Sequence, residues 1–313
     1  MTLSSADQLI EAYAQVGSVN AYLLKRLESV LVQFHEHGIE VMLLKGADLI
    51  PRVYGVMGLR PMTDVDLLVH KTDLPAIDRI LTDSGYQPSI DGNPAYEDPE
   101  RTFSLDLATD LWYLDETSGI WRRAVSRKLG AVPIKGMGAS DLLIYLAAYI
   151  VVHRGYLGRS FSQDLELLVR KEVLDWEFVL EEATRHHLRA PLSHGLTYAA
   201  ARGRAKIPER VLSALAPAGL AEQCQAFLLR KLVTERRVQD VSHFLLFLTQ
   251  PGRRRWRWLA TTLFPSRDFL RYRYGARAET HPFLTRLTRP FFLLVQALKL
   301  SVRILVHLIK QPA

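Results

Sequence analysis

Two aspartates, Asp64 and Asp66, stand two positions apart at the start of the apolar run Leu67–Val69. Residues i and i+2 of a β-strand project from the same face, so we expect the two carboxylates to lie side by side. Carboxylates in this arrangement repel each other unless a cation lies between them. Mg²⁺ is the hard cation that proteins hold with one or two carboxylates together with substrate phosphates. The spacing therefore predicts a metal site for phosphate chemistry.

A lysine and a glycine precede this pair in the chain. The apolar run Val41–Leu44 ends abruptly at Lys45-Gly46, and a helix-compatible segment follows. A glycine at a strand-to-helix turn leaves backbone N–H groups open to phosphate oxygens. The pattern indicates a phosphate-binding turn beside the two carboxylates.

The segment Arg101–Asp115 offers candidates for a third carboxylate. Apolar residues at 103, 105 and 107 alternate with small or polar ones at 104, 106 and 108, which is the period of a half-buried strand. Asp106 lies on the polar face, and Asp110 lies further along the same face. Phosphoryl transfer with two metal ions needs a carboxylate beyond an Asp-x-Asp pair. The pattern by itself leaves both aspartates open.

Two motifs resemble those of a family of uncharacterised bacterial nucleotidyltransferases. They are Lys45-Gly46 after the first strand and the later segment Arg60-Pro-Met-Thr-Asp-Val-Asp-Leu-Leu-Val. The members of this family belong to the DNA polymerase β-like nucleotidyltransferase superfamily. The resemblance implies transfer of an NMP from an NTP to an acceptor, with Mg²⁺ or Mn²⁺ as the cofactor. The site residues that it implies are Asp64, Asp66 and Asp106 as metal ligands and catalytic groups, and Lys45, Gly46 and Arg60 as nucleotide-binding groups.

The chain departs from the family pattern at two places. Most members carry Gly-Ser or Gly-Gly where this chain has Lys45-Gly46, so the serine hydroxyl that typical members use on phosphate is absent. The family segment that often reads Asp-Leu-His matches Asp106-Leu-Ala108, which favours Asp106 over Asp110 as the third carboxylate. Arg60 is a candidate for stabilising the departing pyrophosphate, and an ordinary ion pair with Asp64 is the alternative.

The surrounding elements are predicted from periodicity and from residues that cap or stop helices. One helix is expected to start at Ser4, and a second to run from about Asn20 to His37. A strand at Glu40–Leu44 is expected to pair with a strand at Asp64–Val69. The turn-rich segment Asp91–Glu100 is predicted to be a mobile loop.

From Ser140 onward the pattern is helical, which gives an α+β fold class. The expected architecture is a small nucleotidyltransferase-type mixed β-sheet with flanking helices, followed by a helical domain. The predicted domains are 1–135 (catalytic), 136–250 (helical) and 251–313 (a basic tail).

Composition narrows the class of protein. The chain has 313 residues, enough for two domains, and its single cysteine, Cys224, excludes an intrachain disulfide framework and a cysteine-rich zinc site. The N-terminal residues lack the basic and apolar regions of a secretory signal, so we expect a cytoplasmic protein. No Walker-type loop or dinucleotide fingerprint occurs.

Charge is unevenly distributed along the chain. Residues 1–250 contain 27 Lys and Arg against 31 Asp and Glu, whereas residues 251–313 contain 13 against 2. Such asymmetry predicts an anionic partner for the tail, either a membrane surface or nucleic acid. The run Arg253–Trp258 could stack on bases and bind phosphates, but it is a short footprint, and nucleic acid is the less favoured partner.

The tail ends in an apolar stretch, Phe291–Ile309, that is long enough to cross a membrane. Two charges near its centre oppose crossing, at a cost of about 2.5–3.5 kcal/mol each. The polar residues Gln296, Lys299, Arg303, His307 and Lys310 form a single helical stripe. The pattern predicts an amphipathic helix over 290–310 at the inner face of a membrane, which would make the protein peripheral. The alternative is a helix packed on the protein itself or across a homodimer, with its polar stripe in water.

The sequence therefore predicts a Mg²⁺-dependent nucleotidyltransferase that releases pyrophosphate and modifies a small molecule or a protein. Two alternatives stay open. One is an inactive descendant that binds a nucleotide or a partner, and the other is a nucleic-acid-binding protein that uses the basic tail.

Overall fold

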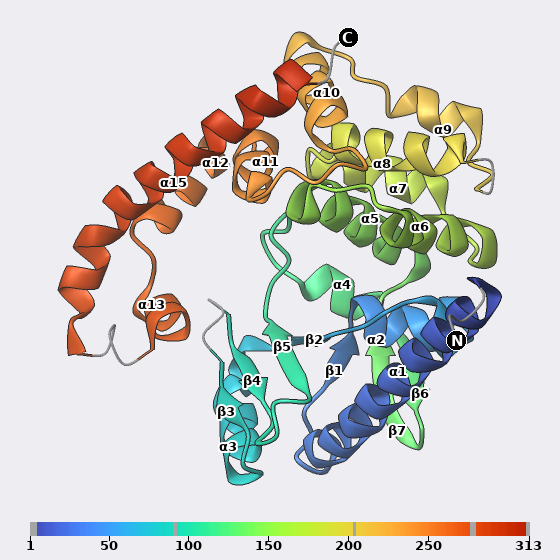
Figure 1. Ribbon diagram of the computed structural model, residues 1–313, viewed down its shortest axis with the longest axis vertical. Helices are drawn as coiled ribbons and strands as arrows, with labels where there is room; N and C mark the ends of the chain where they lie inside the picture. Colours follow the sequence, from blue (N-terminus) through green and yellow to red (C-terminus); the bar gives the residue numbers. More distant parts are fainter. Residues whose placement is uncertain (1–4, 90–92, 203–204, 276–279, 311–313) are drawn as a thin grey trace. The chain divides into compact units, whose positions relative to one another are not determined.

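The computed structural model describes residues 5–89, 93–202, 205–275 and 280–310 (Figure 1). The chain divides into two compact units. The first comprises Met1–Gly138 with Arg271–Ala276, and the second comprises Ala139–Leu270 with Arg277–Ala313. The predicted division into domains 1–135, 136–250 and 251–313 stays a prediction. Each unit is described by itself below.

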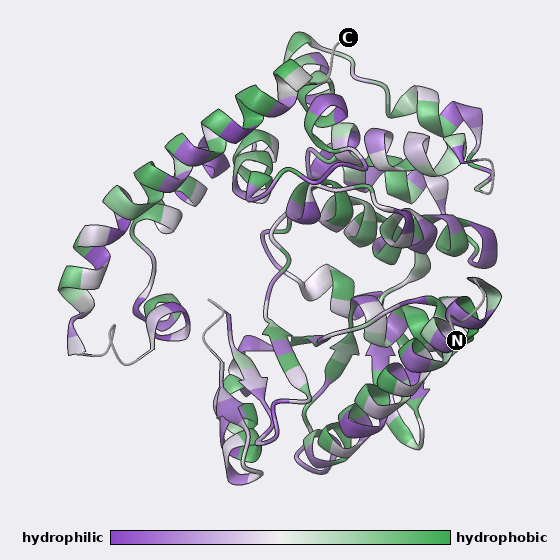
Figure 2. Cartoon of the chain, in the orientation of Figure 1, coloured by the Kyte–Doolittle hydropathy of each residue, from purple (hydrophilic) through white to green (hydrophobic). Residues whose placement is uncertain are grey.

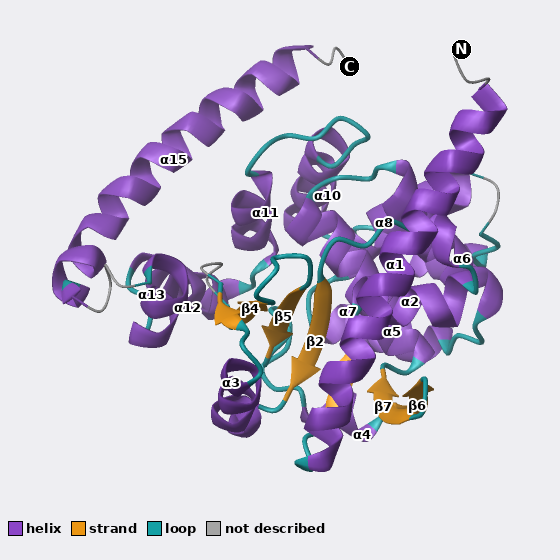
Figure 3. Ribbon diagram, turned by 60° about the horizontal axis from the view of Figure 1, so that its bottom comes forward, coloured by secondary structure: helices purple, strands orange, loops and turns teal. Residues whose placement is uncertain are grey.

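The first unit is built on a mixed sheet of seven strands among its described residues, in the order β3-β4-β5-β2-β1-β7-β6. Strand β2 pairs antiparallel with β1 and parallel with β5, and β1 pairs parallel with β7. Figure 3 shows β4, β5 and β2 side by side. The strands are β1 (Val41–Leu43), β2 (Val65–Val69), β3 (Gln87–Pro88), β4 (Ala95–Glu97), β5 (Ser104–Ala108), β6 (Val125–Leu129) and β7 (Val132–Gly136).

The mixed α+β class and the predicted pairing of the first two strands are confirmed. The helical segments of this unit are short except for α1. They are α1 (Ser5–Glu36), α2 (Lys45–Leu49), η1 (Ile50–Tyr54), η2 (Met57–Leu59), η3 (Lys71–Asp73), α3 (Leu74–Asp83) and α4 (Ser118–Arg122).

Helix α1 is one continuous helix, so the prediction of two helices meeting near Asn20 is wrong. No proline interrupts the segment, and Gly17 remains helical at the point where α1 passes close to Gly58. The predicted start at Ser4 lies outside the described residues. The inner stripe of α1, which includes Leu27, Leu31 and Phe34, is fully buried against the sheet.

Because side chains alternate along the strands, one face of the sheet packs in the core and the other carries the aspartates. Val65, Leu67 and Val69 of β2, together with Leu105 and Leu107 of β5, belong to the core that α1 and α3 cover. Because successive side chains of a strand point to opposite faces, the residues between them project from the other face. That other face carries the aspartates of β2 and β5, so the buried core fixes the direction in which the carboxylates point.

The predicted mobile loop at Asp91–Glu100 is wrong for its described part, because β4 lies within it and pairs with β5. Residues 91 and 92 lie outside the described residues.

The turn after β4 is held by Asp98, whose carboxylate accepts hydrogen bonds from the backbone N–H groups of Thr102 and Phe103 at 2.7 and 2.9 Å. Burial raises the pKa of Asp98, but these hydrogen bonds outweigh burial and hold the pKa below its usual value.

The second unit contains helices and no strand within its described residues. Helix α5 is apolar from Leu142 to its end, and this part lies buried in contact with α6, α7 and α8, as expected of a central core helix. The predicted helical region after the sheet is confirmed. The helical segments that follow the sheet are α5 (Ala139–Ala148), η4 (Tyr149–Arg154), α6 (Arg159–Lys171), α7 (Trp176–Arg185), α8 (Arg189–Ala201), α9 (Glu209–Ala214), α10 (Leu220–Leu232), α11 (Val241–Thr249), α12 (Gly252–Leu263), α13 (Arg267–Tyr274) and α15 (Pro282–Lys310). Helix α13 crosses from the second unit to the first at Leu270.

Candidate metal and nucleotide site

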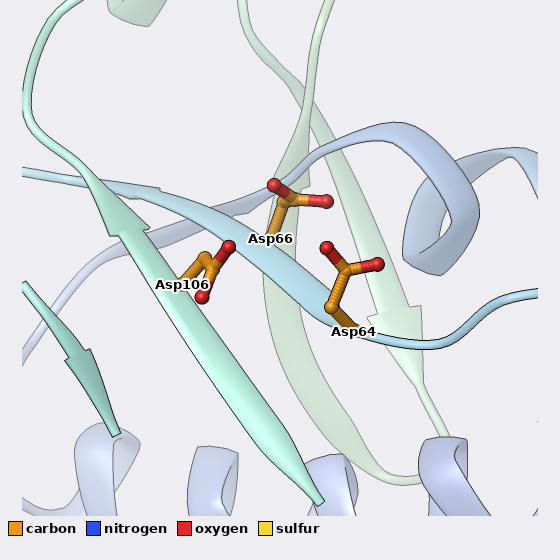
Figure 4. A group of neighbouring side chains, drawn as sticks. All are labelled: Asp64, Asp66 and Asp106. Atoms are coloured by element: carbon orange, nitrogen blue, oxygen red, sulfur yellow. The ribbon is translucent and has the colours of Figure 1, made fainter. Parts of the chain in front are cut away.

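Three carboxylates meet on the face of the sheet opposite the core. Asp66 is the register partner of Asp106 across the parallel pair β2–β5, and Asp64 lies one residue before β2. One carboxylate oxygen from each of the three lies within 4.8 Å of the others. Figure 4 shows the three carboxyl groups on the same side of the two strands. Such a group of hard oxygen donors suits a divalent cation.

Asp110, the competing candidate, lies elsewhere. Strand β5 ends at Ala108, and Asp110 is an exposed residue in the bend that follows. The alternation that would have kept it on the polar face stops with the strand. Among the described residues, the group of three contains Asp106 and not Asp110. The geometry therefore favours Asp106 as the third carboxylate.

Lys45 reaches into this group from the turn after β1. Its ammonium donates to Asp66 Oδ1, and the two side chains are only 18% and 11% exposed. Lys45 has a φ of 44°, in the left-handed region that favours glycine. A non-glycine residue held there costs on the order of 1–3 kcal/mol. A glycine at this position would relieve that strain but would remove the ammonium that contacts Asp66.

Gly46 permits a close approach of two side chains to the turn. A Cβ at this position would lie 2.7 Å from Arg60 Nη1 and 2.8 Å from Met62 Sδ. Arg60 is buried, with 9% of its surface exposed, so it has little room to withdraw. The structure thus brings Lys45, Gly46 and Arg60 together at the turn, and the prediction that they bind a nucleotide stays a prediction.

Asn20 is a residue that the sequence analysis missed. Its side chain is fully buried in the middle of α1, where it donates to the carbonyl oxygens of Met57 and Arg60 at 2.6 and 2.7 Å. Its Oδ1 accepts a hydrogen bond from the N–H of Met62. Asn20 therefore fixes the loop that carries Arg60 and leads to the first aspartate. An amide among leucines on the buried stripe of a helix was the available signal.

Asp48 is a second residue that the sequence analysis missed. Its carboxylate is 1% exposed and forms an ion pair with Arg52 at 3.2 Å and with Arg127 at 3.6 Å. Arg52 also donates to the carbonyl oxygen of Met137 at 2.8 Å. These contacts tie the helical segments after Lys45 to β6 and to the end of β7, so a buried charge network lies behind the turn after β1.

The Lys45–Asp66 contact gives a prediction about stability. Lys45→Met keeps the backbone strain and most of the side-chain volume but removes the ammonium, so three clustered carboxylates lose a cation. We expect the free energy of unfolding in EDTA to fall by about 1–3 kcal/mol relative to the unsubstituted protein. Millimolar Mg²⁺ should restore most of this loss, because a cation among the carboxylates replaces the missing charge.

Thermal and urea unfolding with and without Mg²⁺ measure this effect. The matched control is Lys71→Met, at an exposed lysine away from the carboxylates. It should change the free energy of unfolding neither in EDTA nor in Mg²⁺. If Lys45→Met lost the same stability in EDTA and in Mg²⁺, the inference that a metal ion can replace the charge of the Lys45 ammonium would be contradicted.

Comparison with known proteins gives two findings. A family model described as "uncharacterised nucleotidyltransferase" matches residues 3–203. The solution structure of the antibiotic-resistance factor ANT(2'')-Ia resembles this chain with 13% sequence identity and a TM-score of 0.40, and the match covers 59% of this chain and 97% of that one. No curated protein matches the chain.

Proposed function

The chain belongs to the family of uncharacterised nucleotidyltransferases, and on that premise we propose a Mg²⁺-dependent transfer of an NMP from an NTP to an acceptor, a small molecule or a protein. The observation that carries this proposal is the group of three carboxylates, Asp64, Asp66 and Asp106, within the matched residues. An acceptor hydroxyl attacks the α-phosphorus, the bond from that phosphorus to the bridging oxygen breaks, and pyrophosphate leaves.

The three carboxylates divide the work around the phosphates. Asp64 and Asp66 hold the divalent cation that accompanies the triphosphate, and Asp106 completes the ligand set. A bound Mg²⁺ or Mn²⁺ neutralises phosphate charge and lowers the pKa of the acceptor hydroxyl. Asp106 lies on the neighbouring strand at the same register and accepts the proton of that hydroxyl.

The turn after β1 binds the phosphates. The ammonium of Lys45, which contacts Asp66 in the structure, moves to the β- and γ-phosphates, and the N–H of Gly46 donates to the same oxygens. Arg60 lies beside Gly46 and stabilises the departing pyrophosphate. Because Arg60 is held by the loop that Asn20 fixes, its guanidinium is already positioned before the substrate binds.

The first test is metal-dependent nucleotide binding. We expect the protein to bind at least one of the four common NTPs in Mg²⁺ or Mn²⁺, and at least about tenfold more weakly in EDTA. Asp66→Asn keeps the side-chain shape but removes the charge, so it should abolish the metal dependence. Titration calorimetry with each NTP measures both effects.

Asp110→Asn is the matched control, since it makes the same change at an exposed aspartate outside the group. It should bind NTP as the unsubstituted protein does. Equal NTP affinity with and without EDTA would refute the assignment of Asp64 and Asp66 as metal ligands.

We place this enzyme in the cytoplasm, where its NTP and Mg²⁺ are available, and attach it peripherally to the inner face of the membrane through residues 290–310. The 13 basic and 2 acidic residues of 251–313 support an anionic surface as partner. Nucleic acid is the less favoured partner, because the arginine- and tryptophan-rich run Arg253–Trp258 is one short helical segment.

A further inference from the structure

The C-terminal helix α15 exposes a continuous apolar face. Its exposed apolar residues recur every three or four positions, with adjacent pairs at 283–284, 291–292, 294–295 and 305–306, so they form one wide face along the helix. Figure 2 shows the largely hydrophobic colouring of this helix. Each of these residues is between 42% and 79% exposed: Phe283, Leu284, Leu287, Phe291, Phe292, Leu294, Val295, Leu298, Val302, Leu305, Val306 and Ile309.

Several polar side chains of α15 point the other way, into the helical unit. Arg289 is buried, donates to the carbonyl oxygen of Thr262 at 2.8 Å, and stacks over the ring of Phe269. Arg303 forms an ion pair with Asp240. His307 contacts the carbonyl oxygen of Lys231 at 3.2 Å. The helix is therefore docked by its polar side.

This orientation is the reverse of that in an ordinary surface helix, which turns its apolar stripe to the core. It also departs from the alternative in which the polar stripe faces water, because Arg303 and His307 are held by the protein. Monomeric soluble proteins rarely expose a contiguous apolar patch larger than a few hundred Å². The outer face of α15 therefore has the character of an interaction surface that a partner covers.

Length and composition alone would allow Phe283–His307 to cross a membrane. Crossing would break the contacts of Arg289 and Arg303 and would carry Lys299 into the hydrocarbon layer. A helix that lies flat keeps all of these contacts and buries only its apolar face. The docked geometry therefore favours a helix lying in the interface over one that spans the bilayer.

Charge distinguishes a lipid partner from a second copy of the chain. Arg286 and Lys299 are exposed at the borders of the apolar face. Helix α12, which packs beside α15, exposes Arg253, Trp256 and Arg257. Two copies joined through α15 would bring Arg286 and Lys299 of both copies to one interface, whereas anionic headgroups would neutralise these cations.

We propose that the outer face of α15 lies flat on a bilayer that contains anionic lipids, while the polar side of the helix stays docked on α10 and α12. The family match ends at residue 203, so this surface lies outside the matched residues, which contain the proposed transferase site. The proposal commits to a lipid surface with negatively charged headgroups, and it places the helix axis parallel to that surface.

The experiment is cosedimentation of the full-length protein with vesicles. We expect binding to vesicles of phosphatidylcholine with a minor share of phosphatidylglycerol, and binding at least about tenfold weaker to phosphatidylcholine alone. Added salt should weaken binding only in part, because buried apolar area supplies the remainder. The double variant Leu298→Glu with Val302→Glu changes only the outer face and should lose binding by about tenfold or more.

The matched control is the double variant Val173→Glu with Leu220→Glu. It makes the same charge change at two apolar residues that are 94% and 81% exposed elsewhere in the unit, and its vesicle binding should change less than about twofold. Circular dichroism and unfolding midpoints establish that both variants are folded.

Three results would overturn the proposal. The first is a full-length protein that ignores anionic vesicles at low salt. The second is vesicle-bound protein that alkaline carbonate does not extract, since this indicates a spanning helix. The third is self-association that Leu298→Glu with Val302→Glu abolishes, without vesicle binding, which assigns the face to a second copy.

Discussion

Asp106→Ala is expected to eliminate transfer of the NMP while leaving much of the NTP affinity. Asp106 contributes both a metal ligand and the base that accepts the acceptor proton in the proposed mechanism. Loss of a positioned base alone costs typically 10²–10⁴-fold in rate, and the missing ligand adds to that loss. Asp64 and Asp66 remain in place, so binding of the triphosphate should weaken only modestly.

The measurement needs an acceptor. A screen of cell extract with α-labelled NTP can detect transfer of the label to an acceptor before its chemical identity is known. The label that the unsubstituted protein transfers then defines the assay for the variants. Single-turnover rates separate the transfer step from binding. A further reduction of about tenfold or more in NTP affinity would instead place Asp106 among the main triphosphate ligands.

Asp110→Ala is the control for this prediction. It removes a carboxylate from the segment after β5, but the structure places it in the bend beyond the strand, outside the group of three. We expect its transfer rate to stay within about twofold of the unsubstituted protein. If Asp110→Ala abolished transfer and Asp106→Ala did not, the assignment of the third carboxylate would be wrong.

The sequence predicted the acidic site because its signals are local. The i, i+2 spacing of Asp64 and Asp66 determines a shared face once a strand forms, and the alternation around Asp106 does the same for the second strand. The register that sets Asp66 opposite Asp106 is a contact between distant segments, and spacing alone could not supply it. The family pattern was needed to prefer Asp106 over Asp110.

Asn20 and Asp48 were missed for the same physical reason. Asn20 lies on the buried stripe of α1, but the partners of its amide are in the loop of Met57, Arg60 and Met62, which spacing within the helix does not reveal. Asp48 and Arg52 are spaced i, i+4, which normally indicates an exposed pair on a helix surface. The burial of Asp48 and Arg52 depends on Arg127 and Met137, much later in the chain, so their own spacing does not predict it.

The C-terminal helix illustrates the same limit. Residue spacing predicted the polar stripe, and the structure has a helix there that begins earlier, at Pro282. Spacing cannot say which side of an amphipathic helix faces the protein. That choice depends on partners such as Asp240, which pairs with Arg303 of the stripe, and Thr262, whose carbonyl oxygen accepts a hydrogen bond from Arg289.

The second large effect is expected at Asp48. Asp48→Ala should lower the free energy of unfolding by about 3–5 kcal/mol, because it leaves the buried Arg52 and the half-buried Arg127 without their shared carboxylate. The side chain of Arg52 is only 5% exposed, so water cannot take the place of that carboxylate without a local opening. Urea unfolding followed by circular dichroism measures the change.

A double variant makes this prediction specific to charge. Asp48→Leu with Arg52→Met replaces the buried pair by apolar groups, and such replacements are often neutral or stabilising when the volume is kept. Arg127 is 26% exposed and can turn toward water, so the double variant should be more stable than Asp48→Ala. If both variants lost the same free energy, packing rather than an unpaired buried charge would explain the effect. If Asp48→Ala lost less than about 1 kcal/mol, the network would not hold the turn at all.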